Sequence, residues 1–461
     1  MEIRKYILML LVILPLYASG QIKMMLASDP HVMSKELFDL PYGQAFLNYM
    51  GHDLKAMENS QQLFGDFTAK VIKEHPDILL LPGDLTKDGE LVSHQYVSSK
   101  LDEVRKAGIK VYVIPGNHDM ENPCAYQYKG DKTEKVPSVS EKEFVQMYYQ
   151  DGYAQAVMTD TLSNSYMVYP KDGLALICIN SIIPNKYKYR AVHGRVSSRL
   201  LRWVENAAAK ARQEHRMVLG MMHHEILEHH DQTATFIPTA MVNMEKIKGQ
   251  PSIGEVRNSL RRAGIEVLFT GHYHIQSIKT ASTLYGSITD ITTGALSGYP
   301  SPYRSITLDL QKGTMKVTSA TMFGNATSKW PDTDLSRKEA DRLKYMVRAY
   351  VPKITKTTDM DEAYKYLAEP FGKALCALAA GDEQGHSPKK IIDECMKAWD
   401  NYVCHALQFN VIEINKLRTQ KNGPYTKLRS LFTSIMYNYV NNRKNNTPDN
   451  TYTIKLKEKV V

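Results

Sequence analysis

Five short apolar segments of this chain are each followed at once by residues of the kinds that bind metal ions. The segments are rich in Ile, Leu, Val and Met, and they span Ile22–Ala27, Ile78–Leu81, Val111–Ile114, Met217–Met222 and Val267–Thr270. Continuous apolar runs of about four to eight residues indicate strands that are buried on both faces. Helical patterns separate several of them, for example at Ser99–Ala107 and Ser198–Glu214. This alternation predicts an α/β domain.

The polar residues at the ends of these segments form one chemical set. They are Asp29 and His31 after the first segment, Asp84 after the second, Asn117, His118 and Asp119 after the third, His223 and His224 after the fourth, and His272 and His274 after the fifth. Ligands of open α/β sheets bind beyond the carboxyl ends of the strands, so we expect the five loops to meet at one edge. Carboxylate, imidazole and amide oxygen donors favour Mn²⁺, Fe or Zn²⁺ over thiophilic ions.

The number of candidate ligands predicts two ions rather than one. Seven side chains are too many for one ion of ordinary geometry, namely Asp29, His31, Asp84, Asn117, His223, His272 and His274. Two ions accommodate them if one carboxylate bridges. Asp84 is the natural bridge, because Gly83 before it permits a tight turn and close approach of the backbone.

The series D-x-H, G-D, G-N-H-D, H and G-H-x-H resembles that of the calcineurin-like metallophosphoesterases, over roughly residues 22–322. The resemblance implies a four-layer α/β/β/α sandwich. It implies a first metal held by Asp29, His31, Asp84 and His274, and a second held by Asp84, Asn117, His223 and His272. It favours His223 over its neighbour His224 as the ligand. It also implies that His118 faces the substrate phosphate and binds no metal.

The mechanism implied by this resemblance is hydrolysis by a hydroxide that bridges two metal ions. Two ions clamp the attacking and leaving oxygens and lower the pKa of a bridging water. We expect His118 to protonate the leaving oxygen or to stabilise charge on it. For Asp119 three roles stay open at this point: orienting His118, orienting a metal ligand, or capping backbone groups.

The loop after Asp84 bears on the substrate. Purple acid phosphatases carry a metal-bound tyrosine where this chain has Lys87, and protein serine/threonine phosphatases carry an arginine that this loop lacks. The pattern is therefore closer to the cyclic-nucleotide and glycerophosphodiesterase branch, and we predict a small phosphodiester substrate. A phosphomonoesterase and a non-catalytic metal-binding scaffold or receptor are the alternatives. Lys87 is expected at the surface or within reach of the phosphate.

The first twenty residues have the pattern of a signal peptide. Arg4 and Lys5 precede an apolar run from Tyr6 to Tyr17, and small residues follow at 18–20. The run is shorter than the roughly 20 residues that cross a bilayer. We therefore predict cleavage before Gln21, export to the periplasm or the medium, and no membrane span afterwards. The net charge of +9 includes no Lys/Arg block typical of a nucleic-acid arm.

We expect a catalytic domain over 21–328, closed by a hairpin that turns at Lys312-Gly313, and a mainly helical region over 329–461 that ends in a strand-like TYTIKLK segment. Capping signals for several helices begin at Ser336, Asp359 and Ser387. The number of cysteines is odd, and Cys376, Cys395 and Cys404 are candidates for one bridge.

Three further features have a functional and a structural interpretation. His193 either approaches the site from a loop or lies at the surface, and we favour the surface position. The group at 229–231, two histidines and an aspartate, is expected to be solvent-exposed rather than a metal site. The segment from Tyr299 to Tyr303 either walls the substrate pocket or joins strands.

Overall fold

The computed structural model describes residues 21–50, 53, 55–183, 192–229, 242–243, 249–322, 393–394, 397–398, 400–402, 411–420 and 451–457. The predicted signal peptide, the predicted helices that begin at 336, 359 and 387, and the cysteines at 376, 395 and 404 lie largely or wholly outside these residues. Cys124 and Cys178 are free thiols. Among the described residues, no helix is both long and apolar enough to cross a bilayer.

The first sheet has the strand order β15-β14-β13-β1-β2-β3. Its strands are β1 (Ile22–Leu26), β2 (Ile78–Leu81), β3 (Lys110–Val113), β13 (Pro302–Asp309), β14 (Thr314–Thr321) and β15 (Thr451–Lys455). β1, β2 and β3 are parallel, with Met25 opposite Leu79 and Leu79 opposite Val111, while β13, β14 and β15 add antiparallel strands beside β1. The apolar segments of the sequence thus occupy the middle of this sheet and one edge of it.

The second sheet has the order β11-β12-β10-β9-β8-β7-β6. Its strands are β6 (Met158–Asp160), β7 (Ser165–Lys171), β8 (Leu174–Ile179), β9 (Met217–Met222), β10 (Val267–Thr270), β11 (Ser277–Thr283) and β12 (Gly286–Thr292). β8, β9, β10 and β12 are mutually parallel, β7 and β11 pair antiparallel with β8 and β12, and β6 pairs antiparallel with β7. A small separate hairpin joins β4 (Tyr126–Lys129) to β5 (Lys132–Lys135).

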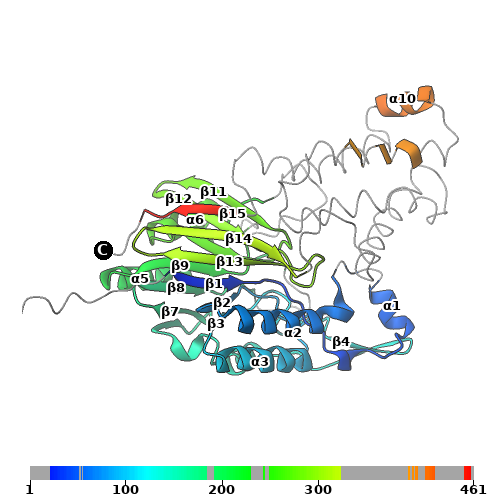
Figure 1. Ribbon diagram of the computed structural model, residues 1–461, viewed down its shortest axis with the longest axis horizontal. Helices are drawn as coiled ribbons and strands as arrows, with labels where there is room; N and C mark the ends of the chain where they lie inside the picture. The colour runs from blue at the N-terminus through cyan, green and yellow to red at the C-terminus, as the bar shows by residue number, and fades with distance from the viewer. Residues whose placement is uncertain are drawn as a thin grey trace, which may run out of the picture.

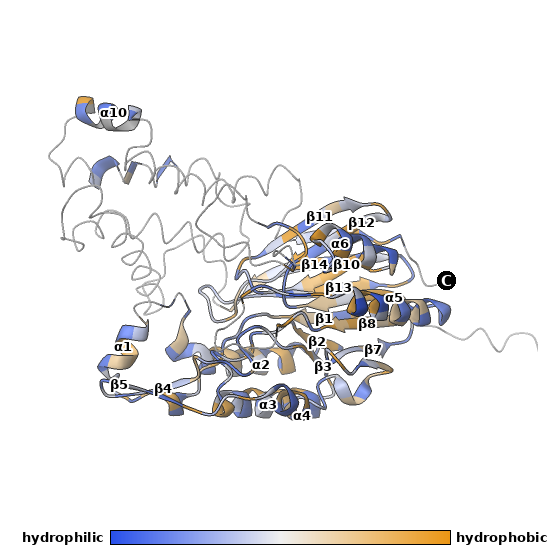
Figure 2. Cartoon of the chain, turned by 180° about the vertical axis from the view of Figure 1, so that it is seen from behind, coloured by the Kyte–Doolittle hydropathy of each residue, from blue (hydrophilic) through white to orange (hydrophobic). Residues whose placement is uncertain are grey.

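Helices cover the outer faces of both sheets, so the layers run α/β/β/α (Figure 1). On the first sheet lie α2 (Met57–Glu74) and α3 (Leu91–Lys106), and on the second lie α5 (Ser198–Gln213) and α6 (Ile253–Arg262). Strands of both sheets are rich in apolar residues, coloured orange in Figure 2, and most of these residues are buried between the layers. The predicted four-layer sandwich is confirmed.

Short elements complete the described part of the chain. They are η1 (Lys35–Leu37), α1 (Gln44–Met50), α4 (Glu141–Met147), η2 (Tyr153–Gln155) and α10 (Val411–Thr419). α1 and the β4–β5 hairpin share a small apolar cluster centred on Phe46 and Tyr128. Ser252 and Glu255 form a reciprocal capping box that starts α6, which fixes where this helix begins.

Two features of the topology position the ligand loops and the C-terminal strand. The five ligand-bearing strands divide between the two sheets of the sandwich, with three in the first and two in the second. Their loops still meet, because the packed sheets present the carboxyl ends of these strands at the same edge. In addition, the strand at 451–455 pairs with β14, so the catalytic sheet includes a segment that we had assigned to the C-terminal region.

Candidate metal centre

Backbone hydrogen bonds between loops bring the candidate ligands together. The amide of Asp29 donates to the carbonyl of Gly83 at 3.3 Å, and the amide of His31 donates to the carbonyl of Asp84 at 3.0 Å, which ties the β1 loop to the β2 loop. In the second sheet the amide of Gly271 donates to the carbonyl of His223 at 3.0 Å. Hydrogen bonds to the neighbouring loop therefore fix the position of each of these loops.

Most of the candidate ligands have an unusual backbone conformation. Five of them have positive φ, namely Asp29 at 52°, His31 at 40°, Asp84 at 49°, His272 at 67° and His274 at 59°. Non-glycine residues rarely adopt this region, and each such residue costs on the order of 1–3 kcal/mol. The surrounding fold maintains these strained backbone conformations, and a cluster of strained residues is typical of functional sites.

Two glycines let the loops approach closely. A Cβ on Gly116 would lie 2.2 Å from the backbone nitrogen of Asp84, and a Cβ on Gly83 would lie 2.6 Å from that of Gly116. Gly83 also has φ of 98°. Neither position therefore accepts a side chain without moving the carboxylate that the sequence analysis proposed as the bridge.

One group of candidate ligands is made of Asp29, His31, Asp84 and His274, whose ligand atoms all lie within 4.8 Å of one another. Nε2 of His31 is 3.1 Å from Nε2 of His274 and 3.6 Å from Oδ2 of Asp84. Oδ1 of Asp29 is 3.3 Å from Nε2 of His274. These are the four residues that we expected around the first ion.

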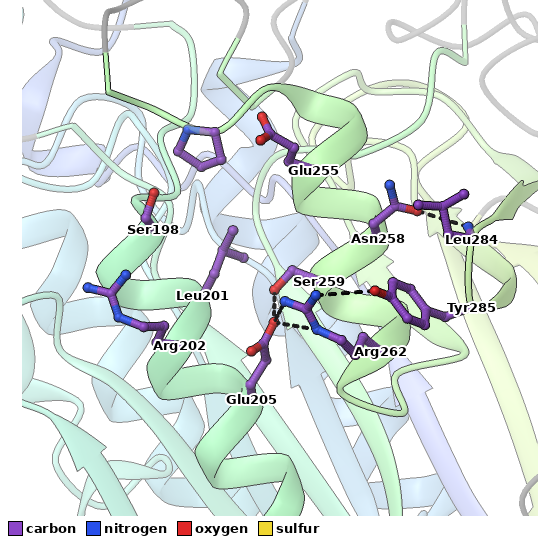
Figure 3. A pocket seen from close by; sticks show the side chains of 11 residues that line it. Ser198, Leu201, Arg202, Glu205, Glu255, Asn258, Ser259, Arg262, Leu284 and Tyr285 are labelled. Atoms are coloured by element: carbon purple, nitrogen blue, oxygen red, sulfur yellow. Dashed lines mark hydrogen bonds and ion pairs between the residues drawn. The ribbon is translucent and has the colours of Figure 1, made fainter.

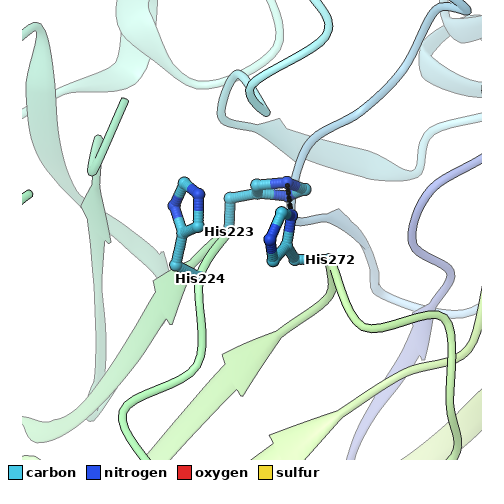
Figure 4. A group of neighbouring side chains, drawn as sticks. All are labelled: His223, His224 and His272. Carbon is cyan, nitrogen blue, oxygen red and sulfur yellow. Dashed lines mark hydrogen bonds between the residues drawn. The ribbon is translucent and has the colours of Figure 1, made fainter. Parts of the chain in front are cut away.

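The second group surrounds His223. Its Nε2 lies 3.2 Å from Oδ1 of Asn117, 3.2 Å from Nδ1 of His272 and 3.4 Å from Oδ2 of Asp84. Figure 4 shows the contact between the rings of His223 and His272, with His224 beside them. His224 is within the same cluster, but its ring nitrogens lie 2.8 Å from Oγ of Ser181 and 3.1 Å from the carbonyl of Val192. His223 is therefore the better placed of the two to share an ion with Asn117 and Asp84.

The chemistry of these atoms fits metal ions. Two ligands at ~2.0–2.2 Å from one ion lie about 3–3.5 Å apart. The contacts between nitrogens and oxygens within the two groups span 3.1–3.8 Å. Oδ1 of Asp29 and Nδ1 of His31 are buried and have no hydrogen-bond partner among the described residues. Oδ2 of Asp84 faces both groups, at 3.6 Å from His31 and 3.4 Å from His223. From this position one carboxylate would reach an ion in either group.

Burial and mutual charge set the electrostatics of the protein part of the site. Burial is the main cause that holds the pKa values of His31 and His272 well below the usual range, which keeps their nitrogens available as ligands. Burial opposes ionisation of Asp84, yet His223 and His118 hold its pKa well below the usual range. Against the effect of burial, Asp84 raises the pKa of His223 to about 10. A cation at this point competes with that proton.

His118 lies at the edge of the two groups with its two ring nitrogens in different surroundings. Nδ1 is 2.5 Å from the carbonyl of Lys87 and 3.0 Å from Oδ1 of Asp88. Nε2 is 3.9 Å from Oδ2 of Asp84, and the ring centroid is 4.6 Å from that of His31. The side chain therefore turns Nδ1 toward Asp88 and Nε2 toward the candidate metal centre.

Lys87 is not a surface residue, which corrects the sequence-based expectation. Its residue exposure is 1%, and Nζ lies 2.5 Å from Oδ2 of Asp88 and 3.2 Å from Oε1 of Glu90. The rings of Tyr49 and Tyr128 cover it, with centroids at 4.9 and 5.6 Å. Partners of opposite charge and aromatic faces make this burial possible. The ammonium thus supports Asp88 and is turned to the protein rather than to a phosphate.

Asp119 takes the third of the roles left open for it. Its carboxylate accepts hydrogen bonds from the backbone amides of Leu85 at 3.1 Å, Thr86 at 2.9 Å and Gly116 at 2.8 Å. Burial, followed by the charge of Asp84, raises the pKa of Asp119 to about 7. We infer that this side chain fixes the β2 loop to the β3 loop, so its part in catalysis is structural.

Glu225 is a residue that the sequence analysis did not single out. It is fully buried next to the histidine pair, and Oε1 accepts a hydrogen bond from the amide of Tyr273 at 3.1 Å and from Oγ1 of Thr292 at 3.0 Å. Tyr273 stands between His272 and His274, so Glu225 anchors the loop that carries both. A buried acid beside two histidines was the signal available in the sequence.

The remaining candidate residues lie outside the ligand groups. His229 is buried, contrary to expectation, with Nδ1 2.9 Å from Oγ of Ser277 and Nε2 3.5 Å from Asp290, while the two residues after it lie outside the described part. His193 is half-buried rather than fully exposed. Tyr303 belongs to β13, and its ring contacts that of Phe67 on α2.

A surface hollow on the outer helix layer is separate from the metal centre. Residues of α5, α6 and the β11–β12 turn line it, and Figure 3 shows Arg262 paired with Glu205 there and Asn258 accepting from the amide of Leu284. None of the candidate ligands is among its lining residues.

The sandwich, and the two ligand groups that meet at Asp84, define the class of α/β/β/α proteins with a candidate metal site at the ends of the strands. The family model for calcineurin-like phosphoesterases matches residues 22–276, which is more than half of the chain. The chain belongs to the calcineurin-like phosphoesterase family, whose members are metal-dependent phosphoester hydrolases, and this confirms the resemblance drawn from the motifs.

Comparisons with other proteins add the following. A dimetal phosphatase from Danio rerio is similar in structure, with a TM-score of 0.43 and 13% identity over 65% of this chain and 95% of that one. A purple acid phosphatase from yellow lupin has a TM-score of 0.40 and 10% identity over 66% and 52% of the two chains. A Thermus thermophilus protein, TT1561, has a TM-score of 0.31 and 10% identity over 65% and 94%. No curated protein matches the chain in sequence.

Proposed function

We propose that this protein hydrolyses small phosphodiesters, among them cyclic nucleotides or glycerophosphodiesters, at a centre of two metal ions. The observation that carries the proposal is the position of Asp84, whose Oδ2 lies 3.6 Å from His31 in one ligand group and 3.4 Å from His223 in the other. The candidate ligands are Asp29, His31, Asp84 and His274 for one ion, and Asp84, Asn117, His223 and His272 for the other. The donor set suits Mn²⁺, Fe or Zn²⁺. When bound, such a pair lowers the pKa of water and neutralises phosphate charge.

His118 supplies the proton in this proposal. The contacts of its Nδ1 with Asp88 and the carbonyl of Lys87 fix the ring and leave Nε2 directed at the centre. From there the imidazolium donates to the leaving oxygen as the ester bond breaks, and it stabilises charge on that oxygen.

The preference for diesters rests on the loop after Asp84. Monoesters carry one more negative charge than diesters, and a free cation in this loop would favour them. The only cation there, Lys87, is paired with Asp88 and Glu90 beneath two tyrosine rings. Phosphomonoester hydrolysis is the alternative function.

The proposal is tested by assaying Mn²⁺-loaded protein with bis(nitrophenyl) phosphate and nitrophenyl phosphate, together with Asp84→Ala. We expect a higher kcat/KM for the diester and no turnover of either compound by the variant. A higher kcat/KM for the monoester overturns the diester preference. Absence of turnover of both compounds, and of a wider panel of phosphate esters, by metal-loaded wild-type protein supports the scaffold alternative instead.

We also propose that the chain is exported after removal of residues 1–20. Support comes from the sequence, in which a charged start, an apolar run and small residues precede Gln21. N-terminal analysis of protein recovered from its native source tests this. Mature chains that begin at Gln21 are expected, and a soluble cytoplasmic chain that retains Met1 contradicts the proposal.

A further inference from the structure

Each group of candidate ligands draws on both sheets of the sandwich. The group around the first expected ion takes three residues from loops of the first sheet and His274 from the second. The group around the second ion is divided evenly, with Asp84 and Asn117 from the first sheet and His223 and His272 from the second. The spacing of the two sheets at this edge therefore decides whether either set of ligands can close around an ion.

Arg304 belongs to the first sheet at the same edge. It lies on β13 opposite Leu26 of β1, which is three residues before Asp29. Its neighbour Tyr303 contacts Phe67 of α2 on the outer face of this sheet, and side chains alternate between the faces of a strand. Arg304, which is fully buried, therefore points to the inner face, into the layer between the two sheets.

The guanidinium of Arg304 reaches the second sheet. Nη2 donates to the carbonyl of Thr292 at 2.7 Å and to that of Ser277 at 3.3 Å, and Nε donates to Oγ1 of Thr293 at 3.2 Å. On the first sheet, Nη1 donates at 2.8 Å to Oγ of Ser319, which lies opposite Arg304 on β14. One planar group that is attached to the first sheet thus contacts three acceptors on β11 and at the end of β12.

These acceptors lie beside the loop that carries ligands of the second sheet. Thr292 is opposite Thr270 in the parallel pair of β12 and β10, and Thr270 is two residues before His272. The amide of Thr293 donates to the carbonyl of Thr270 at 3.0 Å. Arg304 therefore joins the end of β1 to the end of β10, and each of these strands leads directly to candidate ligands.

A buried guanidinium is well suited to hold two sheets at a fixed spacing. Apolar contacts between packed sheets are non-directional, whereas hydrogen bonds require defined distances and angles. The five N–H donors of an arginine are held in a planar fork, so contacts in several directions fix one geometry. Gln276, which is two residues after His274, adds a parallel contact, since its Nε2 donates to the carbonyl of Tyr303 at 3.3 Å.

We propose that Arg304 is a positioning residue of the metal centre, which sets the distance between the ligands of the first sheet and those of the second. The inference rests on the proposed two-ion centre and deepens it. Its effect on the two ions is unequal. When the spacing changes, the first group keeps three ligands on one sheet, whereas the second group is divided two and two. The ion shared by Asn117 and His223 therefore depends more strongly on Arg304.

The test measures the dissociation constants of the two Mn²⁺ ions by chelator titration of the loaded wild-type protein, Arg304→Met and the control Arg261→Met. Arg261 is also buried, but its Nη2 pairs at 2.7 Å with Glu266, which precedes β10 at the edge opposite the ligand loops. Residues that orient metal ligands typically affect metal affinity by about 10- to 100-fold. We expect a fall of that size for one ion in Arg304→Met, a smaller fall for the other, and no fall in Arg261→Met. Asn117→Ala identifies which constant belongs to the second group.

A second pair of variants keeps the proposal testable if Arg304→Met does not fold. Thr293→Val removes the acceptor of Nε beside the second sheet, and Ser319→Ala removes the acceptor of Nη1 on the first. Each variant takes one hydroxyl from the same guanidinium, but only Thr293→Val breaks a contact between the sheets. We expect Thr293→Val to weaken the same ion by about 2- to 5-fold, because one of three such contacts is lost, and Ser319→Ala to leave both constants unchanged.

Three results would overturn the proposal: unchanged constants in a folded Arg304→Met, equal falls for both ions, or equal effects of Thr293→Val and Ser319→Ala. Circular dichroism establishes that each variant is folded. A general loss of stability lowers the unfolding free energy but does not change the relative affinities of the two ions for folded protein. If wild-type protein binds two ions but hydrolyses no ester, the proposed function fails, while these constants still decide the role of Arg304.

Discussion

Oδ1 of Asp88 lies 3.0 Å from Nδ1 of His118, on the side of the ring opposite the candidate metal centre. A carboxylate in this position fixes the orientation of the imidazole. Asp88 is itself held by Nζ of Lys87 at 2.5 Å. Asp88 therefore holds Nδ1 of His118 from the protein side, while Nε2 of the same ring faces the candidate metal centre.

The first prediction concerns this pair. A positioned acid contributes about 10²–10⁴-fold, so His118→Ala should lower kcat by that order for an alkyl leaving group while two metal equivalents remain bound. The loss should shrink for nitrophenolate, which needs little protonation. If His118→Ala empties a metal site, or the loss is equal for both leaving groups, His118 is not the proton donor.

Asp88→Asn extends the same test. Because Asp88 acts through His118, we expect a smaller loss for Asp88→Asn than for His118→Ala, and little further loss when the two are combined. The double-mutant cycle on kcat measures this coupling. Additive losses would assign Asp88 a role of its own.

The second prediction concerns Glu225. Removing its acceptor in Glu225→Ala frees the amide of Tyr273 between His272 and His274, and residues that orient ligands typically affect metal affinity by about 10- to 100-fold. Glu225→Gln keeps an acceptor oxygen and should remain near wild type. Metal titration of both variants, with the exposed Glu103→Ala as control, checks this. Wild-type affinity in Glu225→Ala refutes the anchoring role.

The third prediction concerns Lys87. In Lys87→Met the carboxylates of Asp88 and Glu90 are left buried without their cation, which typically costs about 3–5 kcal/mol of unfolding free energy. The control substitution Lys106→Met, at an exposed position, should change the unfolding free energy by no more than about 0.5 kcal/mol. Urea denaturation of both variants measures the difference. A loss of unfolding free energy as small as that of the control would contradict the buried ion pairs of Lys87 and support the surface position first expected of it.

The fourth prediction is a pH dependence of stability. Burial lowers the pKa of His94 to about 4, from about 6.5 in the unfolded chain. Between these values the unfolded chain binds the proton and the folded chain does not, so stability is lost as pH falls from about 6.5 to 4. The loss is on the order of 3 kcal/mol. Denaturation of His94→Gln should show a flatter profile over this window, and an equally steep profile would exclude His94 as the cause.

The strand ends were predictable because their signals are local. Continuous apolar runs such as Met217–Met222 specify buried strands, and polar residues that directly follow them lie at the carboxyl edge whichever neighbour the strand has. That is why the ligand loops were located correctly although their strands divide between two sheets. The division itself depends on pairing between distant segments, such as β1 with β13, for which an apolar run carries no signal.

The surroundings of the charged residues could not be predicted from local sequence signals in the same way. Lys87 is buried because Tyr49 and Tyr128, from separate elements of the chain, close over it. Glu225 gains its role from Thr292, which lies 67 residues further along the chain. A lysine in a polar loop is usually exposed, and only the assembled fold supplies the partners that reverse that expectation.

The central claim is that Asp84 joins two ions in one centre. Elemental analysis of active wild-type protein and of Asp84→Ala tests it most directly. We predict about two transition-metal equivalents per wild-type chain and, because Oδ2 of Asp84 faces both ligand groups, weakened binding of both ions in the variant together with loss of activity. Full activity with one equivalent, or an Asp84→Ala protein that keeps two ions at wild-type affinity, would contradict the account.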